Sequence, residues 1–174
     1  MSLERLWAGW RSSYIESIDS ELFAADGCLF CGLLAMRDED ALILERGEHS
    51  FAVMNAYPYT SGHVMVVPTR HVASITDLDA TEGAALMHGT QRATSVVERV
   101  YGPEGINLGA NIGRAAGAGV PGHVHIHVLP RWNGDTNFMT AVAETRVLPE
   151  SLRHSYDKLR AAWPTPSTPP RTGT

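Results

Sequence analysis

The sequence predicts a single α+β domain in which one long helix and a C-terminal helix pack on an antiparallel sheet. Short segments of strand character are separated by turns of hairpin length, and one long segment of helical periodicity interrupts them. Strands joined in this way pair antiparallel, and helices then cover the sheet. The 174 residues, of which 44% are hydrophobic, are enough for one core.

The expected strands are bounded by residues that favour turns. The run 57–62, Tyr-Pro-Tyr-Thr-Ser-Gly, separates the second strand from the third. Pro68 closes the third strand and Pro130 the last, while the glycine-rich run 113–119 follows the fourth. The strands are therefore expected at residues 41–46, 50–55, 63–68, 106–112 and 123–129.

Two segments have helical periodicity. From Asp79 to Tyr101 an apolar stripe recurs at helical spacing, and the following Gly-Pro pair ends it. A second helix is expected from Pro149 to Trp163, because proline is favoured in a first turn. We expect an N-terminal arm over residues 1–27, the domain over 28–163, and a disordered proline- and threonine-rich tail over 164–174.

Charge and hydropathy exclude some classes of partner. The net charge of -5 repels a nucleic acid polymer at long range. No window approaches the roughly 18 apolar residues of a membrane span, and the first residues lack a signal-peptide pattern. We therefore expect a soluble, cytoplasmic protein. A small phosphorylated ligand remains compatible, because backbone N–H groups and a few placed side chains can bind it locally.

Both cysteines lie in one unit, Cys28-Leu29-Phe30-Cys31. This spacing is typical of a metal site or a redox pair rather than of an extracellular disulfide framework. Two cysteines alone do not decide between a metal, a redox role and simple packing.

The strongest chemical signal is the alternating run His123-Val124-His125-Ile126-His127. In a strand, successive side chains point to opposite faces, so the three histidines share one face and the apolar residues the other. A neutral imidazole is a nucleophile, and an imidazole N–H stabilises phosphoryl oxygens. The alternatives are a metal site or a chance run on a half-buried strand. In a catalytic site, one ring would attack phosphorus while a neighbouring ring stabilises the phosphoryl oxygens.

This run resembles the signature of the histidine triad (HIT) family, His-φ-His-φ-His-φ-φ with φ apolar, whose members are nucleotidyl transferases and hydrolases. Residues 50–55 and 62–68 resemble the first half of the same fold, and the likeness extends from about Cys28 to Asn137. Within the family, the chain is most similar to the actinobacterial diadenosine tetraphosphate phosphorylase branch. The stretches that carry this likeness are 5–7, 55–59, 130–135 and 137–138.

The resemblance implies a HIT-like fold, a dimer or higher homo-oligomer, and roles for particular residues. His125 would be the covalent nucleophile, and His127 would hydrogen-bond the phosphate. Zinc-containing members join two cysteines, a histidine after the third strand and the first triad histidine in a closed shell, as structural zinc requires. These positions are Cys28, Cys31, His71 and His123. The alternative for His71 is a surface histidine at a strand end.

Three further residues are candidates for binding substrate. Asn55 corresponds to the family position that hydrogen-bonds the ribose, although asparagine before a turn also caps its own backbone. His63 either faces the phosphate chain or is solvated. Trp132 either stacks on the distal half of a dinucleotide or anchors a subunit interface.

The loop before the triad supplies the remaining candidates. Asn111, at the end of the fourth expected strand, would present its amide to phosphate. Four residues before the triad, fragile-histidine-type hydrolases have a glutamine and the phosphorylase branch has a Gly-Ser pair. This chain has Ala118 and Gly119 there, so backbone N–H groups would have to bind the phosphate.

These features predict a two-step reaction on adenine nucleotides or dinucleoside polyphosphates. His125 attacks the α-phosphorus in line, and a second nucleophile then frees the nucleotide. With orthophosphate, diadenosine tetraphosphate gives ATP and ADP; with water, it is hydrolysed. The alternatives are an adenosine phosphoramidate hydrolase and a non-catalytic nucleotide-binding protein. Binding alone does not need a nucleophile, which argues against the latter.

Overall fold

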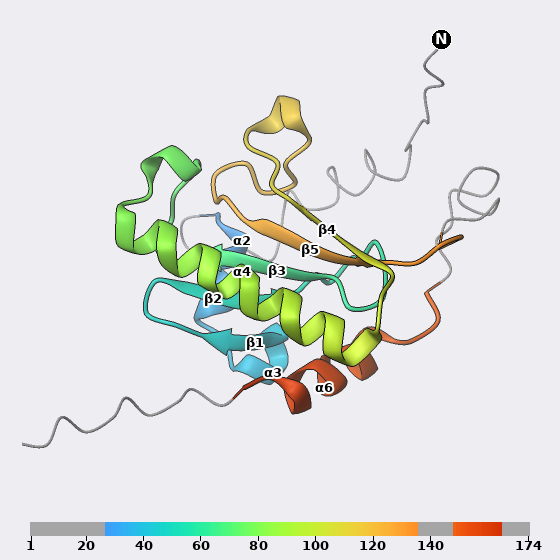
Figure 1. Cartoon of the computed structure of the whole chain (residues 1–174). Helices are drawn as coiled ribbons and strands as arrows, with labels where there is room; N and C mark the ends of the chain where they lie inside the picture. Colours follow the sequence, from blue (N-terminus) through green and yellow to red (C-terminus); the bar gives the residue numbers. More distant parts are fainter. Residues whose placement is uncertain (1–26, 136–147, 165–174) are drawn as a thin grey trace, which may run out of the picture.

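The computed structural model describes residues 27–135 and 148–164 (Figure 1). Apart from Gly27 and Pro164, the predicted arm and tail lie outside the described residues, as do the stretches 5–7 and 137–138. The strands are β1 Ile43–Arg46, β2 Ser50–Met54, β3 Val64–Pro68, β4 Gly105–Gly109 and β5 Ile126–Arg131. The helices are α2 Leu29–Leu34, α3 Asp38–Ala41, η1 Ile75–Asp77, α4 Ala80–Tyr101, η2 Arg114–Ala116 and α6 Leu152–Ala162.

The strands form one five-stranded sheet in the order β1-β2-β3-β5-β4, and every neighbouring pair is antiparallel. The predicted α+β class, with an antiparallel sheet, one long helix and a C-terminal helix, is confirmed. Two registers position the later site: Met65 lies opposite His127 on one side of β5, and Gly109 lies opposite His127 on the other.

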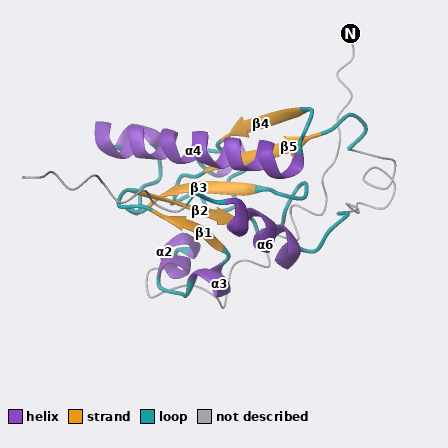
Figure 2. Cartoon of the chain, turned by 60° about the horizontal axis from the view of Figure 1, so that its bottom comes forward, coloured by secondary structure: helices purple, strands orange, loops and turns teal. Residues whose placement is uncertain are grey.

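Helices cover both faces of the sheet. Helix α4 lies on one face, and α2 and α3 lie on the other (Figure 2). Strand alternation sorts the side chains between two cores: Val64 and Val66 pack beneath α4, whereas Met65 and Val67 pack with α2. Strands β2 and β3 are therefore buried along their whole length.

The same alternation places the histidine run. Ile126 and Val128 pack into the α4 side of the sheet, as the sequence predicts for the apolar face. His127 is paired with Met65, which belongs to the α2 side. The triad therefore faces the layer that contains the two cysteines.

Capping residues set the helix bounds. Asp79 and Glu82 form a reciprocal capping box at the start of α4, and Gly102, with φ 52°, ends the helix in the left-handed region. Helix α6 begins at Leu152, three residues after the predicted Pro149, because the Ser151 side chain caps it. No helix in the described part of the chain is both long and apolar enough to cross a bilayer.

The expected start of β1 and the expected end of β4 are wrong. β1 begins at Ile43, because α3 reaches Ala41 and Leu42 turns the chain with φ 57°. β4 ends at Gly109 rather than at residue 112, so Asn111 lies beyond the strand.

The histidine strand also differs from the prediction. β5 starts at Ile126, so His123 and His125 precede it, and it continues through Pro130 to Arg131. Strand β3 pairs with β5 only as far as Val128, so Pro130 has one neighbouring strand. A proline is tolerated where one side of a strand is unpaired.

Candidate active site and metal centre

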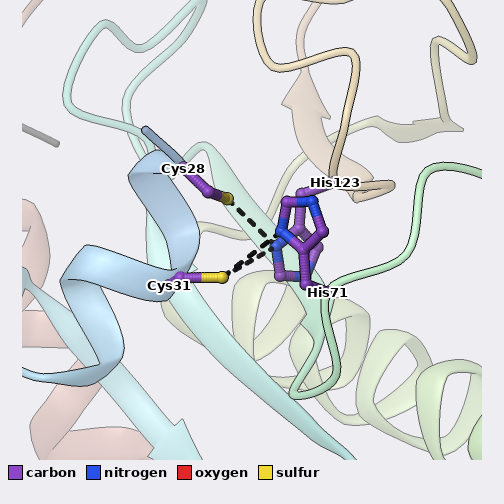
Figure 3. Close-up of side chains that lie close together, drawn as sticks. All are labelled: Cys28, Cys31, His71 and His123. Carbon is purple, nitrogen blue, oxygen red and sulfur yellow. Dashed lines mark hydrogen bonds between the residues drawn. The ribbon is translucent and has the colours of Figure 1, made fainter. Parts of the chain in front are cut away.

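Four side chains from three distant segments converge beside α2 (Figure 3). Cys28 and Cys31 come from the start of α2, one histidine follows β3 and one precedes β5. The Sγ atom of Cys28 lies 3.4 Å from Nδ1 of His123. Sγ of Cys31 lies 3.4 Å from Nδ1 of His71 and 3.8 Å from Nδ1 of His123. The structure thus brings together the four residues predicted as metal ligands.

The geometry fits a tetrahedral metal ion. All four ligand atoms lie within 4.8 Å of one another, and both cysteines are free thiols. Zinc bonds of about 2.0–2.3 Å in a tetrahedron separate neighbouring ligand atoms by about 3.3–3.8 Å. The measured S–N distances of 3.4 and 3.8 Å lie in that interval. The donor set and these three S–N distances are therefore compatible with a tetrahedral zinc site.

A backbone carbonyl fixes the nitrogen that His123 presents to the cysteines. Nε2 of His123 lies 2.9 Å from the carbonyl oxygen of Pro68. A carbonyl oxygen only accepts, so Nε2 donates its proton and Nδ1 keeps the lone pair that a metal requires. Burial lowers the pKa of His123, against a smaller opposing effect of the hydrogen bond to Pro68. The ring is thus held in its neutral, ligating form.

An ion pair anchors the segment that carries His71. Arg70 donates to both carboxylate oxygens of Glu82 in α4, each at 2.6 Å. These hydrogen bonds, with the backbone N–H of Asp79, lower the pKa of Glu82 to about 2. Glu82 therefore stays ionised at neutral pH, capping α4 and holding the chain next to His71.

The middle histidine is oriented by the residue two positions before it. Nδ1–H of His125 donates to the carbonyl of His123 at 2.9 Å, so the lone pair of His125 is on Nε2. Burial lowers the pKa of His125. At neutral pH the buried ring is therefore in the nucleophilic form, with its attacking nitrogen defined.

A relay of hydrogen bonds sets the tautomer of the third histidine. The backbone N–H of Tyr59 donates to Nδ1 of His63 at 3.2 Å, so the proton of a neutral His63 is on Nε2. Nε2 of His63 lies 2.8 Å from Nδ1 of His127 and donates to it. His127 then carries its own proton on Nε2 and is a hydrogen-bond donor there. The predicted alternative of a solvated His63 is wrong, because this side chain is fully buried.

With this geometry in view, comparisons with known proteins establish the family. The HIT domain model matches residues 37–134. The chain belongs to the HIT family. A curated relative, the AP-4-A phosphorylase of Mycobacterium tuberculosis, is 39% identical over 165 residues, which span 92% of this chain and 85% of that protein.

Other members of the HIT family extend the comparison. The asymmetrical bis(5'-nucleosyl)-tetraphosphatase of Schizosaccharomyces pombe is 36% identical over 93 residues, which span 53% of this chain and 50% of that enzyme. Among solved structures, a Zn-bound histidine triad family protein from Mycobacterium smegmatis superimposes with a TM-score of 0.64 at 28% identity. That match covers 80% of this chain and 95% of the other.

Two aromatic residues of this HIT site were not singled out from the sequence. The ring of Phe30, between the two cysteines, lies 4.9 Å from the His125 ring and 5.4 Å from the His123 ring. The ring of Tyr59 is stacked on His127 at 6.0 Å. The only sequence signals were an aromatic residue inside the Cys-x-x-Cys unit and another four residues before His63.

Asn55 is joined to the relay rather than standing apart from it. Its Oδ1 accepts from the backbone N–H of Tyr57 at 2.9 Å, which is the local turn that the sequence left as an alternative. Its Nδ2 lies 3.3 Å from Nδ1 of His63. Asn55 thus holds the turn before β3, and a ribose contact stays a prediction.

The loop candidates lie between β4 and the triad. Nδ2 of Asn111 donates to the carbonyl of Gly117 at 3.4 Å, so this amide holds the loop together. Ala118 is buried, whereas Gly119 is half-buried and offers only its backbone. Phosphate binding by Asn111 and Gly119 stays a prediction.

Trp132 lies on the α4 side of the sheet, away from the histidines. Its ring contacts Tyr101 of α4 at 6.4 Å, edge to face, and its backbone N–H donates to Asp135. The Arg131 guanidinium donates to both oxygens of the same Asp135 carboxylate, at 2.5 and 2.7 Å. These hydrogen bonds stabilise the turn after β5. In the described part of the chain, no hydrogen bond or ring contact joins Trp132 to the histidines, so its substrate role stays a prediction.

Proposed function

We propose that this HIT protein is a nucleotidyl transferase that cleaves dinucleoside polyphosphates through a nucleotidyl-His125 intermediate. The observation that carries the proposal is the hydrogen bond from Nδ1 of His125 to the carbonyl of His123, which leaves the lone pair on Nε2 of a buried, neutral ring. The names of the M. tuberculosis and S. pombe relatives support this class of substrate.

In the first step, Nε2 of His125 attacks the α-phosphorus in line. A bond forms between Nε2 and phosphorus, and the bond from phosphorus to the bridging oxygen breaks, so that the remaining phosphates leave with the second nucleoside. Nε2–H of His127 donates to an α-phosphate oxygen as charge develops there. The positive charge on the nucleotidyl-imidazole is delocalised over the ring and is stabilised by the hydrogen bond from Nδ1–H to the His123 carbonyl.

In the second step, a nucleophile attacks the same phosphorus and restores His125. We propose orthophosphate as this nucleophile, so that diadenosine tetraphosphate gives ATP and ADP. Support comes from the 39% identity to the mycobacterial AP-4-A phosphorylase over nearly the whole chain. The alternative is hydrolysis, which the likeness to the tetraphosphatase favours, and Ala118-Gly119 lacks the side-chain donor of either branch.

We propose that the Cys28, Cys31, His71 and His123 cluster binds one structural zinc ion. The closed donor set and the S–N distances of 3.4–3.8 Å support it, as does the Zn-bound relative. When bound, the ion links α2 to the start of the triad. The homodimer or higher homo-oligomer and the cytoplasmic location implied at the outset also remain proposals.

Phosphate should change both the rate and the products. We expect diadenosine tetraphosphate to be converted to ATP and ADP in phosphate buffer, faster than it is converted to AMP and ATP without phosphate. The nucleotides are separated and quantified by ion-exchange chromatography, and potassium chloride at matched ionic strength is the control. If AMP forms at the same rate in both buffers, the hydrolase function replaces the phosphorylase one.

Loss of the relay donor should lower turnover without removing the nucleophile. In His63→Phe, Nδ1 of His127 loses its donor, so the His127 proton is no longer confined to Nε2. We expect kcat to fall, by at most about 10²- to 10³-fold, the usual cost of losing one oxyanion donor. His88→Asn, on the exposed face of α4, is the matched control. An unchanged kcat in His63→Phe would contradict the relay.

A further inference from the structure

One cation in the described part of the chain is without a partner. Within residues 27–135 and 148–164, every lysine and arginine other than Arg114 has a carboxylate or carbonyl acceptor. The two arginines nearest the site in sequence are both engaged in bidentate pairs, Arg70 with Glu82 and Arg131 with Asp135. Arg114 is exposed, and its guanidinium has no carboxylate or carbonyl acceptor among the described residues.

The loop that carries Arg114 begins and ends at the triad. Gly109, the last residue of β4, lies opposite His127, and the loop runs from Gly109 to His123. Figure 1 shows this loop connecting β4 to β5. Near its end, Val120 packs against the core on the α2 side, which is the side of the histidines. A Cβ on Gly122 would lie 3.7 Å from Nε2 of His71. The C-terminal end of the loop therefore lies on the histidine side of the sheet, a few residues after Arg114.

Backbone contacts hold the loop in shape without the guanidinium. Gly113 and Gly117 have φ of 81° and 82°, a region that favours glycine, and they bracket the η2 turn. The N–H of Gly117 donates to the Arg114 carbonyl at 2.9 Å, and the Asn111 amide donates to the Gly117 carbonyl. Because the turn is closed by these bonds, the Arg114 side chain is available to a ligand.

The reaction proposed above needs a positive charge that the histidines do not supply. A nucleophilic His125 is neutral, and the relay gives His127 one N–H donor. A polyphosphate leaving group carries several negative charges, and its charge rises as the bridging bond breaks. Arginine is the side chain whose fork of N–H groups matches phosphate oxygens.

In-line displacement determines where the positive charge of a phosphate-binding side chain is needed. The leaving polyphosphate departs from the side of phosphorus opposite Nε2 of His125. In the second step the incoming orthophosphate attacks the nucleotidyl-histidine from that same side, forming an oxygen–phosphorus bond as the Nε2–phosphorus bond breaks. The two groups therefore occupy one site in turn, and a single cation can bind both.

We propose that Arg114 binds the phosphate oxygens on the leaving-group side of the α-phosphorus: those of the departing polyphosphate in the first step and of the orthophosphate acceptor in the second. This inference rests on the proposed function and assigns the ligand as an inorganic or nucleotide-linked phosphate. The α-phosphate itself remains with His125 and His127.

Kinetics of Arg114→Ala test the proposal. We expect the KM for orthophosphate to rise and kcat/KM for diadenosine tetraphosphate to fall, each about 10- to 100-fold, as expected for loss of a hydrogen bond to a charged group. Inhibition by AMP, which has no leaving group, should change by only a few-fold. Arg114→Lys keeps the charge and should recover part of both effects. Arg153→Ala, which removes an exposed arginine from α6, should match wild type.

A binding measurement separates this inference from the proposed function. Calorimetry of tripolyphosphate with the zinc-loaded protein requires no turnover, and Arg114→Ala should bind it about 10- to 100-fold more weakly than wild type. If the wild-type protein shows no turnover but still binds tripolyphosphate more tightly than Arg114→Ala, the proposed enzymatic function is overturned and the Arg114 phosphate site is supported. Equal tripolyphosphate affinity, or a change in only one of the two kinetic constants, would overturn the role of Arg114.

Discussion

His125→Asn is expected to lower turnover of diadenosine tetraphosphate by several orders of magnitude while nucleotide binding survives within a few-fold. The asparagine amide can still donate to the His123 carbonyl, which now accepts from Nδ1 of His125 at 2.9 Å. It has no nitrogen lone pair at the position of Nε2, so the covalent bond to phosphorus does not form. Turnover is followed by chromatography of the products and binding by calorimetry with AMP.

His127→Asn is the matched variant, because it alters the neighbouring ring on the same face. It removes a donor to the phosphate but leaves the nucleophile, and one such donor is worth roughly 3–4 kcal/mol at most. We therefore expect a smaller loss than in His125→Asn. The order of the two effects distinguishes the bond-forming residue from the stabilising one.

Trapping provides a second measurement. Brief exposure to substrate labelled at the α-phosphate, followed by an alkaline quench, should leave acid-labile label on the wild-type protein and none on His125→Asn. Near-normal turnover by His125→Asn would rule out this mechanism even though the HIT family is established.

Removal of the metal is expected to have the second large effect, on folding rather than on chemistry. We expect about one zinc per chain, retained through dialysis, because a closed Cys2His2 shell binds tightly and is coupled to folding. Chelation should lower the melting temperature and expose both thiols. The reason is local: Cys28 is buried, and α2 has only six residues, too few to be stable without an anchor.

Cys28→Ser tests the same centre by mutation. It removes a ligand whose sulfur lies 3.4 Å from His123, and we expect both loss of zinc and a lower melting temperature. Ser95→Ala, on the exposed face of α4 and outside the cluster, is the control. Zinc is quantified by elemental analysis and stability by calorimetry. A folded, zinc-free wild-type protein with an unchanged melting temperature, or a Cys28–Cys31 disulfide in it, would contradict the metal proposal.

The long helix and the sheet could be predicted because their signals are local. The apolar stripe and the Asp79 cap define α4 within one stretch of chain, and the alternation around Ile126 defines which face of β5 is apolar. The strand ends were less predictable. Ala41 reads as the start of a strand but ends a helix, and Pro130 stays in β5 because β3 has already stopped pairing. Both outcomes depend on neighbours that periodicity does not reveal.

By itself, the sequence determined the fold class, the shared face of the three histidines and, through the family resemblance, the Cys28, Cys31, His71 and His123 set. These follow from patterns within short windows or from recognised motifs. Only the tertiary structure decided that His63 hydrogen-bonds His127, that Phe30 packs on His125, and that Trp132 lies against Tyr101. The physical reason is that a side chain's protonation and partner depend on which atoms meet it across the sheet. Strand order and register set those contacts, and they bring together residues far apart in the sequence.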